Sequence, residues 1–305
     1  MHLSSEWVIG GLMRLSKALG VREFVVGFLV MASAASLPNL FVGITSATRG
    51  IPELSLGDVF GNNFVAMTLA VLVAILFAPK KEIETGGKTV QTTAIFTMIA
   101  ALLPIVLLFD GTLSRVDGII LLGLFVCYLY WLFVKQGLFT RVYNHENGGI
   151  PSAEKIRRSM KDILWVAGGI VILVAASVGI VLSASFFAKG LGVPLLLVGL
   201  LVTGLGNALP EIYFAIASSK KSETQLIIGN LMGAVIFPAT LVLGIVALIH
   251  PISSVNFQFA LSSRIFLFIA AVLFFIFTRT KKKISLGEGL VLLALYVSFV
   301  AAILF

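Results

Sequence analysis

Nine apolar stretches of roughly twenty residues or more divide this chain, and each is long enough to cross the ~30 Å hydrocarbon core of a bilayer as a helix. They cover residues 24–48, 54–78, 90–109, 117–134, 162–187, 194–218, 225–249, 257–278 and 286–305. Because 59% of the residues are apolar and only 12% are charged, the chain cannot present a polar surface on all sides. The sequence therefore predicts an all-α membrane protein. We interpret residues 1–19 as the end of a shortened first helix.

The basic residues are concentrated at alternate loops. Of the 22 Lys and Arg residues, all but four lie at one set of loops, and the exceptions are Arg49, Arg115, Lys189 and Arg264. Cytoplasmic loops carry such an excess, so the pattern predicts a cell-membrane protein with a cytoplasmic linker at 136–160 and an external C-terminus. The net charge of +8 thus reports topology. It indicates a lipid bilayer rather than a nucleic acid as partner, and the sequence indicates no protein partner.

The chain repeats itself when residue i is aligned with residue i+172. "VGFLVMASAASLPN" (26–39) aligns with "VGLLVTGLGNALPE" (198–211), and "LGDVFG" (56–61) aligns with "IGNLMG" (228–233). Self-similarity over such a distance indicates a duplicated structural unit.

The alignment continues after a slip of one residue, where "DGIILLGLF" (117–125) matches "EGLVLLALY" (288–296). Each repeat then contains five helices, and because five is an odd number the two copies must insert with opposite orientation. The prediction is a ten-helix, inverted-topology repeat with nine full spans and the shortened first helix, an architecture typical of secondary transporters. The first repeat is residues 1–135, the linker 136–160 and the second repeat 161–305.

Pro38 and Pro210 stand near the middle of two apolar stretches, at equivalent positions of the repeat. Proline donates no backbone hydrogen bond, so it leaves the carbonyl one helical turn earlier without its partner. The carbonyls of Ala34 and Gly206 would be freed in this way and could face an ion at the repeat interface. The alternative is a kink that serves helix packing only.

Asp58 and Asn62 lie four residues apart and therefore on one face of a helix. They follow glycines spaced GxxxG, at Gly57 and Gly61, which allow close approach of a neighbouring helix. An ionisable residue inside a membrane span marks a candidate functional site, and Asp58 and Glu211 are the carboxylates that we expect well within the bilayer. The alternative for Asp58 is a helix cap near the membrane surface.

Four short motifs resemble those of the sodium/calcium exchanger branch of the cation/calcium exchanger superfamily. They are "AASLPN" (34–39), "GDVFGN" (57–62), "GNALPE" (206–211) and "GNLMGA" (229–234). In that family the ions are held by the motif glutamates, by Ser and Thr before the Leu-Pro pair, and by polar residues of the glycine-led helices. Glu211 matches one glutamate and Ser36 one serine, while Asn39 replaces the second glutamate.

The resemblance implies a secondary active cation antiporter that works by alternating access, with helices 1 and 6 sliding past a core of helices 2, 3, 7 and 8. The candidate ion ligands are Glu211, Asp58, Asn39, Ser36, Asn62 and Asn207, with the carbonyls of Ala34 and Gly206. The transported cations would be Na⁺, Ca²⁺ or H⁺. Calcium prefers six to eight oxygens, and one or two carboxylates suit a monovalent ion or a proton at least as well.

Two alternatives stay open beside this function: an exchanger fold with altered, proton- or monovalent-coupled selectivity, and a scaffold that does not transport. An enzyme is not expected, because His2, His145 and His250 are scattered and no HExxH or CxxC motif occurs. No cofactor is expected either.

Overall fold

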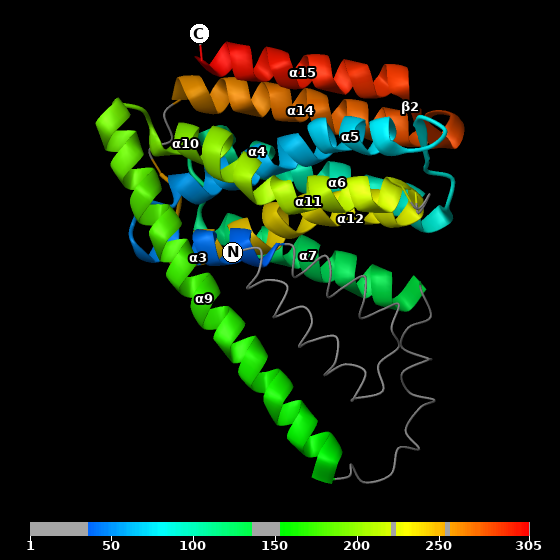
Figure 1. The fold of residues 1–305 in the computed structure, drawn as a ribbon. Coiled ribbons are helices and arrows are strands. Elements are labelled where there is room, and N and C mark those ends of the chain that lie inside the picture. Colours follow the sequence, from blue (N-terminus) through cyan, green and yellow to red (C-terminus); the bar gives the residue numbers. More distant parts are fainter. Residues whose placement is uncertain (1–35, 136–152, 221–223, 254–256, 305) are drawn as a thin grey trace.

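The computed structural model describes residues 36–135, 153–220, 224–253 and 257–304 (Figure 1). The helices of the first half are α3 (Leu37–Thr48), α4 (Glu53–Met67), α5 (Leu69–Phe77), α6 (Lys88–Leu107) and α7 (Arg115–Lys135). Those of the second half are α9 (Ala153–Leu191), α10 (Leu195–Val198), α11 (Gly204–Lys220), α12 (Thr224–Ile236), α13 (Leu243–Ile249), α14 (Phe257–Arg279) and α15 (Leu286–Leu304). Two π-helical segments, η2 (Gly199–Thr203) and η3 (Phe237–Val242), join α10 to α11 and α12 to α13.

Within the described residues, eight helical segments are long and apolar enough to cross a membrane. They coincide with eight of the nine apolar stretches, so the all-helical membrane fold is confirmed. The remaining stretch, 24–48, is described only from Ser36, the N-cap of α3, onward. Residues 1–19 lie outside the described residues. Most of the predicted linker at 136–160 also lies outside them, although α9 already begins at Ala153.

The core of the molecule is formed by the repeat-equivalent spans Glu53–Phe77 and Ile227–Ile249. They are 83% and 78% buried, against 22% for the span Ala167–Leu191 of α9. α4 contacts α3, α11 and α12, so it lies at the centre of the bundle. α9 runs obliquely to the other long helices (Figure 1) and packs mainly on α3.

Equivalent threonines distort the two central spans. Thr68 has non-helical backbone angles and separates α4 from α5, and its hydroxyl donates to the Phe64 carbonyl at 2.5 Å. Thr240, 172 residues later, lies in η3 and donates to the Ile236 carbonyl at 2.6 Å. Such bonds from a threonine to the preceding turn bend helices. The two halves of the chain therefore share a local irregularity as well as a sequence pattern.

Short backbone pairings join the two halves of the chain. β1 (Glu82–Glu84) follows α5 and pairs antiparallel with β2 (Lys283–Ser285), which precedes α15. This pairing of β1 with β2 is named the β1–β2 clip. At the opposite end of α6, Leu113 pairs with Ile252. These contacts were not predicted, because three-residue strands in polar loops leave no periodic signal.

The last helix of each half starts with the same cap. The Asp117 carboxylate accepts hydrogen bonds from the backbone and hydroxyl of Ser114, both at 2.7 Å. Glu288 binds Ser285 in the same way, at 2.7 and 2.8 Å. These capping boxes lie at the positions aligned after the one-residue slip.

Proline has a different effect in each half. Pro38 lies in the first turn of α3, where its missing N–H leaves no helical bond unmade. Pro210 lies inside α11, which continues through it. A proline in the middle of an apolar stretch also predicts a broken helix, and for Pro210 this prediction is wrong. The irregular turn of this span is the π-helical segment η2, upstream of the proline, and membrane helices tolerate proline where local adjustments of this kind satisfy the backbone.

Candidate functional site

The candidate site lies where α4 crosses η2 and α11 at backbone contact. A Cβ atom added to Gly57 would overlap the Leu196 carbonyl oxygen, and one added to Gly61 would overlap that of Leu200. From the other side, a Cβ on Gly204 would lie 2.8 Å from the Asn62 backbone nitrogen. The close approach predicted from the GxxxG spacing is confirmed for Gly57 and Gly61, and it brings polar side chains of the two helices within reach of each other.

Asp58 is fully buried at this crossing. The Asn207 side chain of α11 donates to Asp58 Oδ1 at 2.8 Å. α4 begins at Glu53 with Pro52 as its N-cap, so Asp58 lies inside the helix and the helix-cap alternative is wrong. The buried Asp58–Asn207 pair instead ties a carboxylate of the first half of the chain to an amide of the second half.

Asn62 lies one turn further along α4 and reaches α12. Its Nδ2 donates to the Ala234 carbonyl at 3.1 Å. Asn62 and Ala234 are separated by 172 positions, the offset of the internal repeat. The candidate residues of α4 therefore lie where the two halves of the chain meet.

Several buried oxygens near this junction accept no hydrogen bond within the described part of the chain. They are Ser36 Oγ, Asn39 Oδ1, Asp58 Oδ2, Asn62 Oδ1 and both carboxylate oxygens of Glu211. Their residues are at most 3% exposed. Leaving a buried polar group unsatisfied costs about 1–3 kcal/mol, and native proteins contain few such groups. A set of them on neighbouring elements is what a site for desolvated cations requires.

The unpartnered oxygens come from elements that share α4 as a neighbour. Asn39 lies on α3 and Glu211 on α11, and both helices contact α4. Glu211 lies one helical turn after Asn207, the residue of α11 that binds Asp58. The structure thus brings Asp58, Asn207 and Glu211 to one crossing and places Asn39 on α3, which also contacts α4.

The two predicted carbonyl ligands differ from the other candidate ligands. Ala34 lies outside the described residues. Gly206 lies on the exposed face of α11, with no atom within 4 Å of where its Cβ would be, whereas Asn207 and Glu211 are buried. Gly206 is therefore the one described candidate that is not buried.

Two further polar groups of α4 were missed by sequence reasoning. Ser55 Oγ and Asn63 Oδ1 are buried and have no hydrogen-bond partner among the described residues. Ser55 precedes Asp58 by three residues, a spacing that places both on one face of a helix. This spacing was a usable signal for Ser55, whereas Asn63 follows Asn62 directly and faces a different direction.

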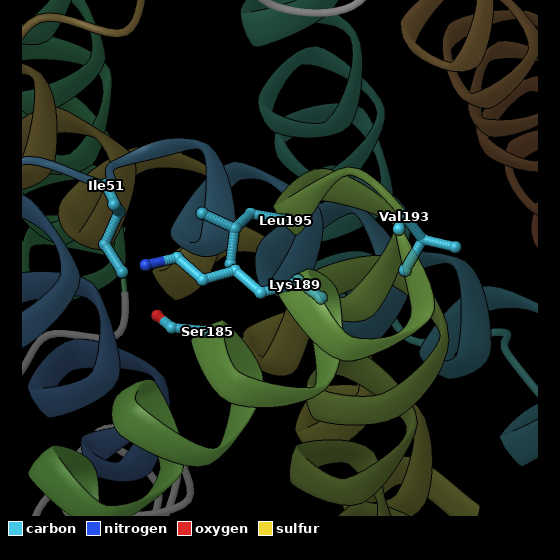
Figure 2. Close-up of a pocket in the computed structure, with 7 residues that line it drawn as sticks. Ile51, Ser185, Lys189, Val193 and Leu195 are labelled. Atoms are coloured by element: carbon cyan, nitrogen blue, oxygen red, sulfur yellow. The ribbon is translucent and has the colours of Figure 1, made fainter.

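A separate pocket of about 450 Å³ lies beside the C-terminal end of α9 (Figure 2). It is lined by Ile51, Ser185, Ala188, Lys189, Gly192, Val193 and Leu195. Lys189 is its one charged lining residue, and none of the candidate ligands lines it. A cation would meet the ammonium group of Lys189 there, so this pocket is not the candidate site.

The ligand chemistry of the site is that of hard cations. Within the described residues, no three His, Cys, Asp or Glu side chains gather as a transition-metal site would need. Carboxylate, amide and hydroxyl oxygens are instead the groups that bind ions such as Ca²⁺. The residue types gathered here are therefore those that an alkali or alkaline-earth cation would need.

Comparison with known proteins agrees with this chemistry. The sequence profile described as sodium/calcium exchanger protein matches residues 1–134 and 161–305. The chain is 24% identical to the sodium/calcium exchanger MaX1 of Methanosarcina acetivorans, over 99% of this chain and 94% of the relative. It is 29% identical to the inner membrane protein YrbG of Escherichia coli, over 78% of this chain and 73% of that protein.

The fold also matches a solved structure. The sodium-calcium exchanger NCX_Mj superposes with a TM-score of 0.65 and 23% sequence identity, over 98% of this chain and 93% of that one. At this identity the likeness concerns the fold. It shows that the described helices have the arrangement of a known ion exchanger.

Proposed function

The chain belongs to the sodium/calcium exchanger family, and from this premise we propose that it is a secondary active cation antiporter. It would work by alternating access, with its ion site between two inverted five-helix repeats, residues 1–135 and 161–305, joined by the linker 136–160. Ten helices, the first shortened, would make up the two repeats. The membrane-protein relatives and the basic loops favour the cell membrane, with the linker in the cytoplasm and the C-terminus outside.

The observation that carries this proposal is the set of buried, unpartnered oxygens around α4. We assign Glu211 and Asp58 as the charged ligands and Asn39, Asn62 and Ser36 as neutral ones. Asn207 contributes through Asp58, and the carbonyls of Ala34 and Gly206 complete the proposed set. The bound ions would be substrates, Na⁺, Ca²⁺ or H⁺, and the protein would need no cofactor and catalyse no covalent reaction.

The position of α9 supports the sliding step. This helix is largely exposed and packs on α3, α10 and η2 rather than within the core. A helix with so little buried surface can move along the bundle without unpacking it. α9 corresponds to helix 6 of the proposed ten, the second half's counterpart of helix 1.

A specific observation favours altered selectivity as the second candidate. Asn39 stands where its repeat partner is Glu211, and Ala234 stands opposite Asn62. Amides and an alanine supply fewer charges and oxygens than Ca²⁺ usually receives. Coupling to a proton or a monovalent cation would suit such a site.

Flux measurements in liposomes test the function. Purified protein should exchange radioactive Ca²⁺ or Na⁺ against an opposing cation gradient, and Glu211→Gln should abolish the exchange because it removes a buried charge that a cation compensates. Glu84→Gln is the matched control, since Glu84 is exposed, lies in the β1–β2 loop region away from the candidate ligands, and forms an exposed ion pair with Lys80 at 3.8 Å. A wild-type protein that moves none of Ca²⁺, Na⁺ or H⁺ would identify a scaffold. Full exchange by Glu211→Gln would remove the centre of the site.

A further inference from the structure

Asn62 and Ala234 mark the axis that relates the two halves of the chain. They are equivalent positions of the repeat, and they contact each other through a hydrogen bond of 3.1 Å. Two equivalent residues of a two-fold-related pair can touch only beside the axis itself. The pseudo-two-fold axis therefore passes between α4 and α12 at this bond.

The carboxylates are not distributed evenly about this axis. Asp58 of α4 corresponds to Asn230 of α12, and Glu211 of α11 corresponds to Asn39 of α3. In each pair one side chain is an acid and the other an amide. Both acids belong to α4 and α11, which pack on each other, whereas α12 and α3 carry the amides.

The two acids also share one environment. Asp58 and Glu211 are 0% and 1% exposed, and the Asn207 amide holds Asp58 Oδ1 at 2.8 Å. Asp58 Oδ2 and both Glu211 oxygens remain without a partner in the described part of the chain. The buried basic side chain of the described residues is Arg264, and the carboxylate that acts on its charge is Asp110. No described basic group compensates the two acids.

We propose that the cation binds off the pseudo-two-fold axis, against the α4–α11 crossing, and that the site takes a load of two positive charges. This load is one divalent ion or two monovalent ions, so exchange of one load for the other moves no net charge. The inference rests on the proposed antiport function and adds the place and the charge of the substrate. Asn207 is a positioning residue, because its hydrogen bond fixes one oxygen of Asp58.

The charge of the load follows from desolvation. An isolated charge in a low-dielectric interior costs several kcal/mol even after relaxation. The occupied site is therefore most stable in the membrane when the charges of its carboxylates and of the bound cations sum to about zero. Two carboxylates are neutralised by two positive charges. A third positive charge would find only amides, which supply oxygens but no compensating charge.

A charge-relocation pair tests the position of the site. Asp58→Asn should lower the affinity of the full chain for Ca²⁺ at least about tenfold, measured by equilibrium dialysis with radioactive Ca²⁺ in detergent. Asp58→Asn combined with Asn230→Asp restores the total charge but moves it across the axis, and it should not restore the affinity. Recovery to within about twofold of wild type, or an unchanged affinity in Asp58→Asn, would overturn the off-axis site. Asn230→Asp alone, with Asp58 in place, should keep Ca²⁺ affinity and shows that position 230 tolerates an acid.

Dependence on membrane potential tests the charge of the load. In liposomes clamped with K⁺ and valinomycin, the Ca²⁺ gradient reached at steady state should not change with a potential of about 100 mV. Movement of one net charge per cycle would instead change it about fifty-fold, and this result would overturn the proposal while leaving antiport intact. Absence of any cation flux in wild type would overturn both, so the two failures are distinguishable.

Discussion

α4 and α9 are both apolar helices of this chain, yet they differ in burial and in how closely they pack on their neighbours. α4 is buried on nearly all sides, carries Asp58, Asn62 and Asn63, and is packed through glycines on the backbone of its neighbours. α9 is mostly exposed, and no atom of the described residues lies within 4 Å of a Cβ added to Gly168 or Gly179. We therefore expect a displacement of α4 to cost more packing than a displacement of α9.

The polar contacts of α4 are also stronger than those of α9. α4 is tied to its neighbours through a carboxylate and through backbone groups. α9 is tied to α3 by one pair of hydroxyls, Thr45 and Ser177, at 2.8 Å. A hydroxyl pair can be exchanged for another when a helix slides. The comparison teaches that the proposed ion ligands lie on the tightly packed helix, whereas the peripheral helix makes few polar contacts.

The largest effect on stability is expected when a glycine of α4, rather than a glycine of α9, is replaced by alanine. Gly61→Ala should destabilise the protein by about 3 kcal/mol, because the new methyl group overlaps the Leu200 carbonyl and must push α4 from η2. Gly179→Ala on α9 should be neutral or stabilising by up to about 1 kcal/mol, because alanine favours the helix and meets open space. Denaturation in mild detergent measures both. Equal effects would show that α4 is no more rigidly packed than α9.

The next effect concerns Asn207. Asn207→Leu should destabilise the protein by about 1–3 kcal/mol, because the buried Asp58 Oδ1 loses its donor. Asn207→Ser is the matched control, since a hydroxyl can still donate, and it should recover part of the loss. Thermal unfolding together with Ca²⁺ binding checks this prediction. If the leucine variant were as stable as wild type, the amide would not hold Asp58 in place.

A smaller effect is expected at the α3–α9 contact. Ser177→Ala removes a buried hydroxyl pair worth about 0.5–1.5 kcal/mol. Because the bond joins α9 to α3 in one relative position, its loss should shift the balance between access states up to about tenfold. Accessibility of a cysteine introduced next to the site, measured from each side in a Cys127→Ser background, reports the shift. Ser185→Ala, whose hydroxyl bonds only to its own helix, should cause none.

The smallest effect lies at the β1–β2 clip. The Glu82 carboxylate accepts a hydrogen bond from Lys283 at 2.7 Å and, with the nearby charges of Glu288 and Glu84, raises the pKa of Lys283 above its ordinary value. A raised pKa adds stability below the unfolded value of about 10.4, and this stability is lost as pH rises through the folded value. Glu82→Gln should therefore lower the Tm slightly near neutral pH and not at strongly alkaline pH. A difference that grew with pH would contradict this sign.

The membrane fold could be predicted from the sequence because its signals are long and redundant. Apolar runs of about twenty residues predict helices that span the membrane. The 172-residue offset predicts that these helices form two related sets. Close packing at Gly57 and Gly61 was also predictable, since only glycine permits it. The backbone conformation around Pro210 was not predictable. A proline removes one hydrogen bond but does not determine how the neighbouring helical turns adjust.

The candidate site was predictable in its members but not in its pairing. Asp58 and Glu211 stand out as acids within apolar runs. That Asp58 binds Asn207, and that Asn62 reaches Ala234, depends on how two helices cross, and no periodic pattern encodes a crossing point. Ser55 and Asn63 were missed because isolated polar residues of this kind are frequent in packed membrane helices.

The β1–β2 clip has a consequence for biogenesis. It joins Glu82 to Lys283, positions 201 residues apart, so it can close only after nearly the whole chain has left the ribosome. Gly57, Gly61 and Asp58 also find their partners in the second half of the chain. We therefore expect the first half to reach its final packing only after the second half has been inserted.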